Sequence, residues 1–194
     1  MQLARKTLQN DFVALVPIDE THREGLRAAA ADRAIWKHWV RDSRDWDAMF
    51  EEQLAKEKAG SWIHFTVMDR LNGDRIVGQT CFLEIRAPHD GVEIGGTWYA
   101  PSVQGGAVNP ASKLLLLSHA FDSGAERVEL KTDALNERSR AAIAKLGAHF
   151  EGIHRRHMRR GDGSMRDSAY YSIIREEWPA VRAGLEARLI ALVA

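Results

Sequence analysis

The sequence has little cysteine and no long apolar run. Its single cysteine, Cys81, excludes an intramolecular disulfide and a zinc site built from cysteines, which suits a reducing compartment. No apolar stretch approaches the ~18 residues that suggest a membrane-spanning helix. The first residues, MQLARKTLQNDF, lack the apolar middle of a signal peptide. We therefore expect a cytoplasmic protein.

Neither sign of charge is in excess, because Lys plus Arg and Asp plus Glu both number 27. Nothing in the overall charge attracts nucleic acid or an anionic membrane. Among the 8 histidines, none has a ligand-like partner four residues away on a helix, so we expect no metal site. With 194 residues, 45% of them hydrophobic, the chain is expected to form one domain over residues 1–194 with a substantial core.

The spacing of apolar residues predicts an alternation of strands and helices. Strands are expected over residues 12–16, 62–68, 76–85, 92–99, 126–133, 148–159 and 165–174, and helices over 20–32, 43–59, 111–121, 136–146 and from 178 onward. Asn72-Gly73 favours a tight hairpin, and the sequence RGDG at 160–163 favours a second turn. This order predicts an α/β (α+β) fold, a mixed sheet with helices packed on it.

Residues 98–117, WYAPSVQGGAVNPASKLLLL, pass from a strand through two glycines into a leucine-rich helix. Asn109 followed by Pro110 is typical of an N-cap and first helical residue, so the helix is expected to begin at Pro110. Gly105 and Gly106 then lie just upstream, where free backbone N–H groups and the helix dipole favour an anion such as a pyrophosphate. A plain glycine turn before a buried helix is the alternative.

Several motifs, in the expected order, resemble those of the GNAT N-acetyltransferases. The segment QGGAVN at 104–109 resembles their acyl-CoA pyrophosphate loop, and NERS at 136–139 with KLG at 145–147 resembles their Asn-x-x-Ser…Lys-x-Gly segment. The last third is similar to the branch of ribosomal-protein alanine and serine N-terminal acetyltransferases, through Glu151-Gly152, Gly163, Arg166-Asp167, Tyr171-Ser172-Ile173 and Glu177-Trp178. The resemblance implies a mostly antiparallel central sheet flanked by helices on both faces. It also implies transfer of acetyl from acetyl-CoA to a primary amine, either a protein N-terminal α-amino group or a small-molecule amine.

The resemblance also identifies the residues that would hold acetyl-CoA. They are Trp98, Gln104, Gly105, Gly106, Ala107, Val108, Asn109, Asn136 and Ser139. Two positions depart from the family pattern, because Ala107 stands in place of glycine and Asn109 in place of glycine or alanine. Alanine is disfavoured where φ is positive, which predicts a different loop path, and an Asn109 cap would compete for the amides that should receive phosphate. Asn136 and Ser139 are also natural residues for a helix start.

The chemistry implied is direct transfer of the acetyl group to a neutral amine. Glu93 is the predicted general base and acts through water, since an α-amino group with a pKa of ~7.7–8.0 needs little help to lose its proton. An exposed strand glutamate in an ion pair is the alternative. Glu93 lies one residue further from Trp98 than the family spacing, which predicts a β-bulge, and backbone amides at 95–98 would polarise the thioester carbonyl. Ile143 replaces the tyrosine that many relatives use, so Ser139 is the predicted proton donor to the thiolate.

The predicted acceptor-binding residues are Trp36, Trp39, Arg156 and Arg166. The early tryptophans form either an aromatic lid over the acceptor or a satellite core. The basic stretch HRRHMRR at 154–160 either lines the acceptor cleft or lies on a solvated strand end, and without interleaved aromatic residues it is a poor nucleic-acid site. Arg166-Asp167 either positions the substrate or forms a cross-strand ion pair.

Other functions remain open on the same fold. The chain could be a catalytically weak GNAT-fold domain that senses CoA or binds protein, since fold does not fix function. The donor could carry another acyl group, such as succinyl. The apolar face of the last helix would serve a homodimer as well as the core.

Overall fold

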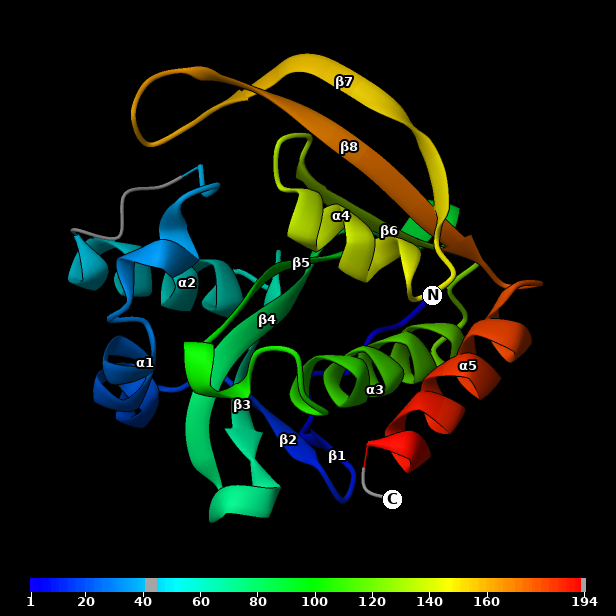
Figure 1. Ribbon diagram of the computed structural model, residues 1–194, viewed down its shortest axis with the longest axis horizontal. Helices are drawn as coiled ribbons and strands as arrows, with labels where there is room; N and C mark the ends of the chain where they lie inside the picture. The colour runs from blue at the N-terminus through cyan, green and yellow to red at the C-terminus, as the bar shows by residue number, and fades with distance from the viewer. Residues whose placement is uncertain (41–44, 193–194) are drawn as a thin grey trace.

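The structure is a computed structural model that describes residues 1–40 and 45–192, and its centre is one mixed sheet (Figure 1). The strands are β1 Leu8–Gln9, β2 Val13–Pro17, β3 Ile63–Asp69, β4 Arg75–Arg86, β5 Gly91–Tyr99, β6 Arg127–Asp133, β7 His149–Arg159 and β8 Met165–Ile174. Their spatial order is β1-β2-β3-β4-β5-β6-β8-β7. Neighbours are antiparallel except β5 and β6, which are parallel. The predicted mixed, mostly antiparallel sheet is therefore confirmed.

Helices cover both faces of this sheet, as expected. The α-helices of the described residues are α1 Arg23–Ala29, α2 Trp46–Lys58, α3 Val108–Asp122, α4 Glu137–Ala144 and α5 Trp178–Ala191, and short 3-10 turns are η1 Glu20–His22, η2 Arg33–Trp36, η3 Arg70–Asn72, η4 Ala87–His89 and η5 Pro101–Val103. On one face, α3 and α5 lie side by side over the main core (Figure 1), which includes Phe65, Phe82 and Leu117. On the other, α1 and α2 cover a smaller core that includes Leu26, Phe50 and Trp98.

The helix α3 follows from its own sequence. Leu116, Leu117, Ala120 and Phe121 recur at helical spacing and are all buried against the sheet. Each of the leucine and phenylalanine side chains contributes about 1.5–3 kcal/mol when it leaves water. The helix ends before Gly124, whose φ of 92° is the left-handed conformation expected of a C′ glycine.

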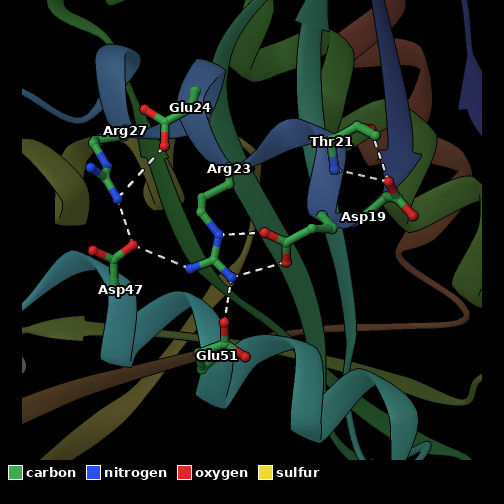
Figure 2. Close-up of polar contacts among 8 residues, drawn as sticks. Asp19, Thr21, Arg23, Glu24, Arg27, Asp47 and Glu51 are labelled. Atoms are coloured by element: carbon green, nitrogen blue, oxygen red, sulfur yellow. Dashed lines mark hydrogen bonds and ion pairs between the residues drawn. The ribbon is translucent and has the colours of Figure 1, made fainter.

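The helices α1 and α2 are joined by a network of ion pairs (Figure 2). Arg23 of α1 contacts Glu20 at 2.6 Å, reaches Asp47 of α2 at 3.2 Å, and also pairs with Glu51. Arg27 contacts the same Asp47. The Arg23 guanidinium also lies over the Phe50 ring, 4.5 Å from its centroid. Single surface pairs contribute little, but a shared arginine fork fixes the two helices relative to each other.

Three details differ from the sequence predictions. The tight hairpin at Asn72-Gly73 was wrong, because Asp69 pairs with Arg75 across a longer connection that contains η3. Asp69 accepts a hydrogen bond from the Leu71 amide and so nucleates this 3-10 turn. The first predicted helix, 20–32, is the turn η1 followed by the shorter α1, and the two-residue β1 was not predicted. The start of the predicted helix 43–59 lies partly outside the described residues.

Within the described residues, the helices are too short or too polar to span a bilayer.

Candidate functional site

The strands β5 and β6 separate in the middle of the sheet. Their parallel pairing joins only Gly91–Glu93 to Arg127–Glu129, although β5 continues to Tyr99 and β6 to Asp133. Beyond Glu93, therefore, β5 is bonded only to β4 on its other side. Gly96 is exposed even though it lies in this central strand. The gap leaves main-chain groups of β5 free for a ligand.

A bulge in β5 lies beside this gap, as the spacing of Glu93 predicted. Cys81 pairs with Gly95 and Gln79 with Trp98, so β5 has one residue more than β4 between these pairs. Gly96 has a φ of 55°, a conformation that glycine adopts without strain. The bulge reorients the backbone amides of 95–98 relative to a regular strand.

A buried lysine lies behind the bulge. The Lys113 side chain of α3 is 6% exposed, and its Nζ donates to Thr97 Oγ1 at 3.0 Å. Thr97 Oγ1 also lies 2.8 Å from Thr80 Oγ1. Burial lowers the pKa of Lys113 to about 8. Sequence reasoning missed this residue, because nothing in a leucine-rich helix marks one lysine as buried.

Glu93 is buried at the start of the gap. It is 3% exposed, and its Oε2 accepts a hydrogen bond from Lys131 Nζ at 2.7 Å. The ion pair considered at the sequence level is present, but it is not on an exposed surface. Burial raises the pKa of Glu93 above its usual range, and Lys131 only partly opposes this rise. A carboxylate with a raised pKa is a better proton acceptor near neutral pH.

The glycine loop leads into α3 earlier than predicted. The helix begins at Val108, and Asn109 lies inside its first turn, so the prediction of Asn109 as N-cap was wrong. The cause is Gly105, whose φ of 83° turns the chain so that Ala107 already accepts the first helical bond. Ala107 itself has a φ of −74° and is unstrained. Within the described residues no side chain caps α3, so its first amides are available to an anion.

The first turn of α4 meets this loop. Asn136 Oδ1 accepts from the Ser139 amide at 3.0 Å, which confirms Asn136 as N-cap. Arg138 donates to Gln104 Oε1 at 2.6 Å, and Gln104 donates in turn to the Tyr99 carbonyl at 2.7 Å. These contacts bring together two motifs that are 34 residues apart in sequence. Within the described residues, the Ser139 hydroxyl makes no hydrogen bond. Sequence reasoning missed Arg138, since only the fold places it beside Gln104.

The tryptophans pack mainly as a satellite core. The Trp36 ring lies 5.6 Å from the Trp98 ring and 5.0 Å from the Trp39 ring, measured between centroids. Trp36 is 9% and Trp98 3% exposed, and the Trp98 indole donates to Gln79. The side chain of Trp98 thus belongs to the smaller core, which leaves its backbone for a ligand. Trp39 is half-buried, and its contact with an acceptor stays a prediction.

One face of the sheet is polar from β5 across β6 and β8 to β7. This polar face consists of Glu93, Lys131, Tyr170, Ser168 and His157. Lys131 pairs in register with Tyr170, whose hydroxyl lies 3.3 Å from His157 Nε2. His157 Nδ1 lies 3.1 Å from Ser168 Oγ. Burial raises the pKa of Tyr170 and lowers that of His157. This face carries the predicted base, Glu93, at one end.

Arg166 and Arg156 lie in different environments on the hairpin of β7 and β8. Arg166 is 8% exposed and donates from Nε to Ser168 Oγ at 3.0 Å, on the polar face. Arg156 is exposed, with a φ of 50°, at a bulge where β7 has two residues more than β8. Asp167 accepts from the Arg156 amide at 2.6 Å, and no ion pair joins it to Arg166 within the described chain. Acceptor contacts by both arginines stay predictions.

In the described part of the chain, no group of three or more His, Cys, Asp or Glu side chains is arranged to hold a metal.

Comparison with known proteins gives the family. The family model described as "Acetyltransferase (GNAT) domain" matches residues 13–149. A solved structure from T. thermophilus, described as an acetyltransferase, is 30% identical, with 97% of this chain and 100% of that chain covered and a TM-score of 0.87. A GCN5-related N-acetyltransferase from Brucella melitensis is 28% identical, with 96% and 86% covered and a TM-score of 0.87.

More distant structures share the fold. Mycobacterium smegmatis RimJ, solved in complex with CoA-disulfide, is 24% identical, with 94% of this chain and 92% of that chain covered and a TM-score of 0.78. A comparison with functionally curated proteins found no match. The family match extends over most of the chain, and it includes the separated strands, the glycine loop and the start of α4. The chain belongs to the GNAT acetyltransferase family.

Proposed function

We propose that the protein transfers acetyl from acetyl-CoA to a primary amine, either a protein N-terminal α-amino group or a small-molecule amine. The observation that carries this proposal is the contact of Gln104 with Arg138. It places the starts of α3 and α4 together, so that the amides of two helices and the free edge of β5 serve one ligand. A cofactor with a diphosphate at one end and a thioester at the other fits such an arrangement.

The residues at the loop fit the diphosphate of CoA. The uncapped amides at the start of α3 supply donors without side chains in the way, and a side-chain carbon built at Gly105 would meet nothing within 4 Å. Gln104 and Arg138 add polar groups beside them, and Asn136 and Ser139 lie where the pantetheine arm would pass. Support also comes from Mycobacterium smegmatis RimJ, whose structure contains a CoA-disulfide.

The residues at the gap fit the transfer itself. Glu93 takes the amine proton through water, the nitrogen attacks the thioester carbon, and the C–S bond breaks. Amides of the bulge at 95–98 hold the developing oxyanion. The Ser139 hydroxyl, which has no hydrogen-bond partner in the described residues, hydrogen-bonds the leaving thiolate and passes it a proton that solvent water replaces. Ile143 stands in place of the tyrosine, and its hydrocarbon side chain has no proton to donate. It is 7% exposed and packs in the main core.

Ile143 also favours a second candidate function. A domain with this cofactor site and no tyrosine donor would bind CoA as a sensor and turn over slowly. The two functions differ in turnover and agree in binding. Titration calorimetry with acetyl-CoA and CoA tests the shared step, and release of free thiol across a panel of amines and peptides tests the transfer.

Two variants test the assigned roles. Glu93→Gln is expected to lower kcat by 10²-fold or more at saturating substrate, a loss on the order of that for a removed general base, and Ser139→Ala to lower it less. Glu126→Gln is the matched control, because Glu126 is an exposed glutamate that pairs with Arg175 and not with the Glu93 site. Unchanged turnover in both Glu93→Gln and Ser139→Ala would discard the scheme. Binding of acetyl-CoA without turnover on any acceptor would favour the sensor.

A further inference from the structure

Arg166 is a buried arginine with most of its donors uncommitted. It is 8% exposed, and its one hydrogen bond to the described residues runs from Nε to Ser168 Oγ. Its terminal groups Nη1 and Nη2, which carry four N–H donors, bond to nothing in residues 1–40 and 45–192. A buried guanidinium is normally forked onto a carboxylate, because an unpaired buried charge is costly. This arginine therefore requires an explanation.

Nearby carboxylates are committed elsewhere. Asp133 accepts two hydrogen bonds from Arg160, at 2.6 and 3.0 Å, and a third from the Leu135 amide. Asp167 accepts from a β7 amide, and Glu93 is paired with Lys131. Burial lowers the pKa of Arg166, and the charges of Asp133 and Glu93 only partly offset that effect. The protein thus supplies surrounding negative potential but no direct partner.

The guanidinium lies on the polar face that carries the predicted base, because its Nε bonds to the Ser168 hydroxyl of β8. Ser168 is two residues from Tyr170 on the same strand, and Tyr170 pairs in register with Lys131, the partner of Glu93. In the described residues, the fully enclosed side-chain atoms without a partner are Trp46 Nε1, His64 Nδ1 and the Tyr99 hydroxyl. The Nη atoms of Arg166 are not among them, so they keep some contact with solvent, which a bound ligand would replace.

We propose that Arg166 forms a carboxylate-binding subsite, so that the acceptor is an amine that also carries a carboxylate. This inference rests on the proposed transferase function, because it places the acceptor on the face that holds Glu93. The planar fork of Nη1 and Nη2 matches a carboxylate in a bidentate pair. An acceptor without the acid would leave the guanidinium unpaired, so the subsite discriminates strongly against neutral analogues.

The test uses matched peptide amides with a free N-terminus. Each has an alanine scaffold with Glu or Gln at its first, second or third position, and thiol release from acetyl-CoA gives kcat/KM. At one position the Glu peptide should exceed the Gln peptide by about tenfold or more. Arg166→Gln should remove this preference by slowing the Glu peptide alone, and Arg166→Lys should keep part of it. Arg182→Gln, which removes an exposed charge from α5, should leave it intact.

Two further measurements separate the possible failures. The urea midpoint of Arg166→Gln should equal or exceed that of the wild type, since an uncompensated charge is removed, and a large drop would show a structural arginine instead. Calorimetry with the N-acetylated forms of the same peptides reports binding without transfer. Arg166-dependent binding of an acidic peptide without turnover on any acceptor supports the subsite and defeats the transferase. Equal turnover of Glu and Gln peptides at every position defeats the subsite and leaves the transferase standing.

Discussion

The buried Lys113 is predicted to lower the stability of the folded protein, because its ammonium group has only a neutral hydrogen-bond partner. Its pKa falls from the ordinary 10.5 to about 8 in the folded protein. At ~1.4 kcal/mol for each pKa unit, this difference is an unfavourable free energy of about 3 kcal/mol at neutral pH. Lys113→Met keeps the length of the side chain and removes the charge. The variant should therefore be more stable than the wild type at pH 7.

The net gain is smaller than the full penalty. The variant loses the hydrogen bond from Lys113 to Thr97, worth about 1 kcal/mol. Thr97 keeps Thr80 as a hydroxyl partner, so no buried group is left unpaired. The expected increase in the free energy of unfolding is therefore about 2 kcal/mol at pH 7.

The pH dependence has a definite sign. The folded pKa lies below the unfolded one, so between pH 8 and 10.5 the unfolded chain binds more protons and stability rises with pH. Below about pH 8 both states hold the proton, and the full penalty persists. The advantage of Lys113→Met should thus be constant up to about pH 8 and shrink as the pH approaches 10.5.

Urea unfolding at pH 7, 8, 9 and 10 measures this curve. The difference between variant and wild type cancels alkaline groups that do not interact with Lys113, such as Tyr99, whose pKa burial raises. Lys6→Met, at an exposed lysine, is the control and should show little change at any pH. A variant that is less stable at pH 7, or a difference that does not vary with pH, would refute an uncompensated ammonium.

Three other perturbations test the site. Gly96→Ala should lower the free energy of unfolding by about 2 kcal/mol, because φ is 55° and the new carbon would lie 2.8 Å from Cys81 Sγ. In a double-mutant cycle, Cys81→Ala should recover the part of this loss that comes from the clash, and additive losses would contradict the geometry. Lys131→Met should raise the pKa of Glu93 further, so the acidic limb of the kcat/KM profile should move to higher pH; an unmoved limb would show that Glu93 is not the base. Arg138→Ala should raise KM for acetyl-CoA several-fold with kcat retained, and a fall in kcat alone would place it elsewhere.

The sequence predicted those features that depend on local pattern. Strand and helix periodicity located most elements, and Asn136 as N-cap and the bulge after Glu93 were both confirmed. Asn109 was misjudged because capping competes with the conformation of the preceding loop. The left-handed Gly105 starts α3 two residues earlier than the Asn-Pro pair indicates. A local preference was overridden by the path of the chain.

The features that escaped prediction depend on contacts between distant segments. Arg138 meets Gln104 only because α4 follows β6, which diverges from β5 beyond Glu93. The burial of Lys113 likewise depends on how α3 lies over the bulge. Spacing along the chain contains no information about such pairs, because the contacts form only when distant segments fold together.

The placement of buried charge gives the most general argument for a site here. Glu93, Lys113 and Arg166 are each less than a tenth exposed, and only Glu93 has a charged partner in the described residues. A chain selected for stability alone would fill such positions with apolar side chains, since unpaired buried charges destabilise the folded state. All three lie on elements that adjoin the separated strands or the polar face beside them. A function would explain why the protein keeps these three buried charges despite their cost in stability. Lys113 and Arg166 would stabilise the negative charge of a bound ligand or of a transition state, and Glu93 would remove a proton.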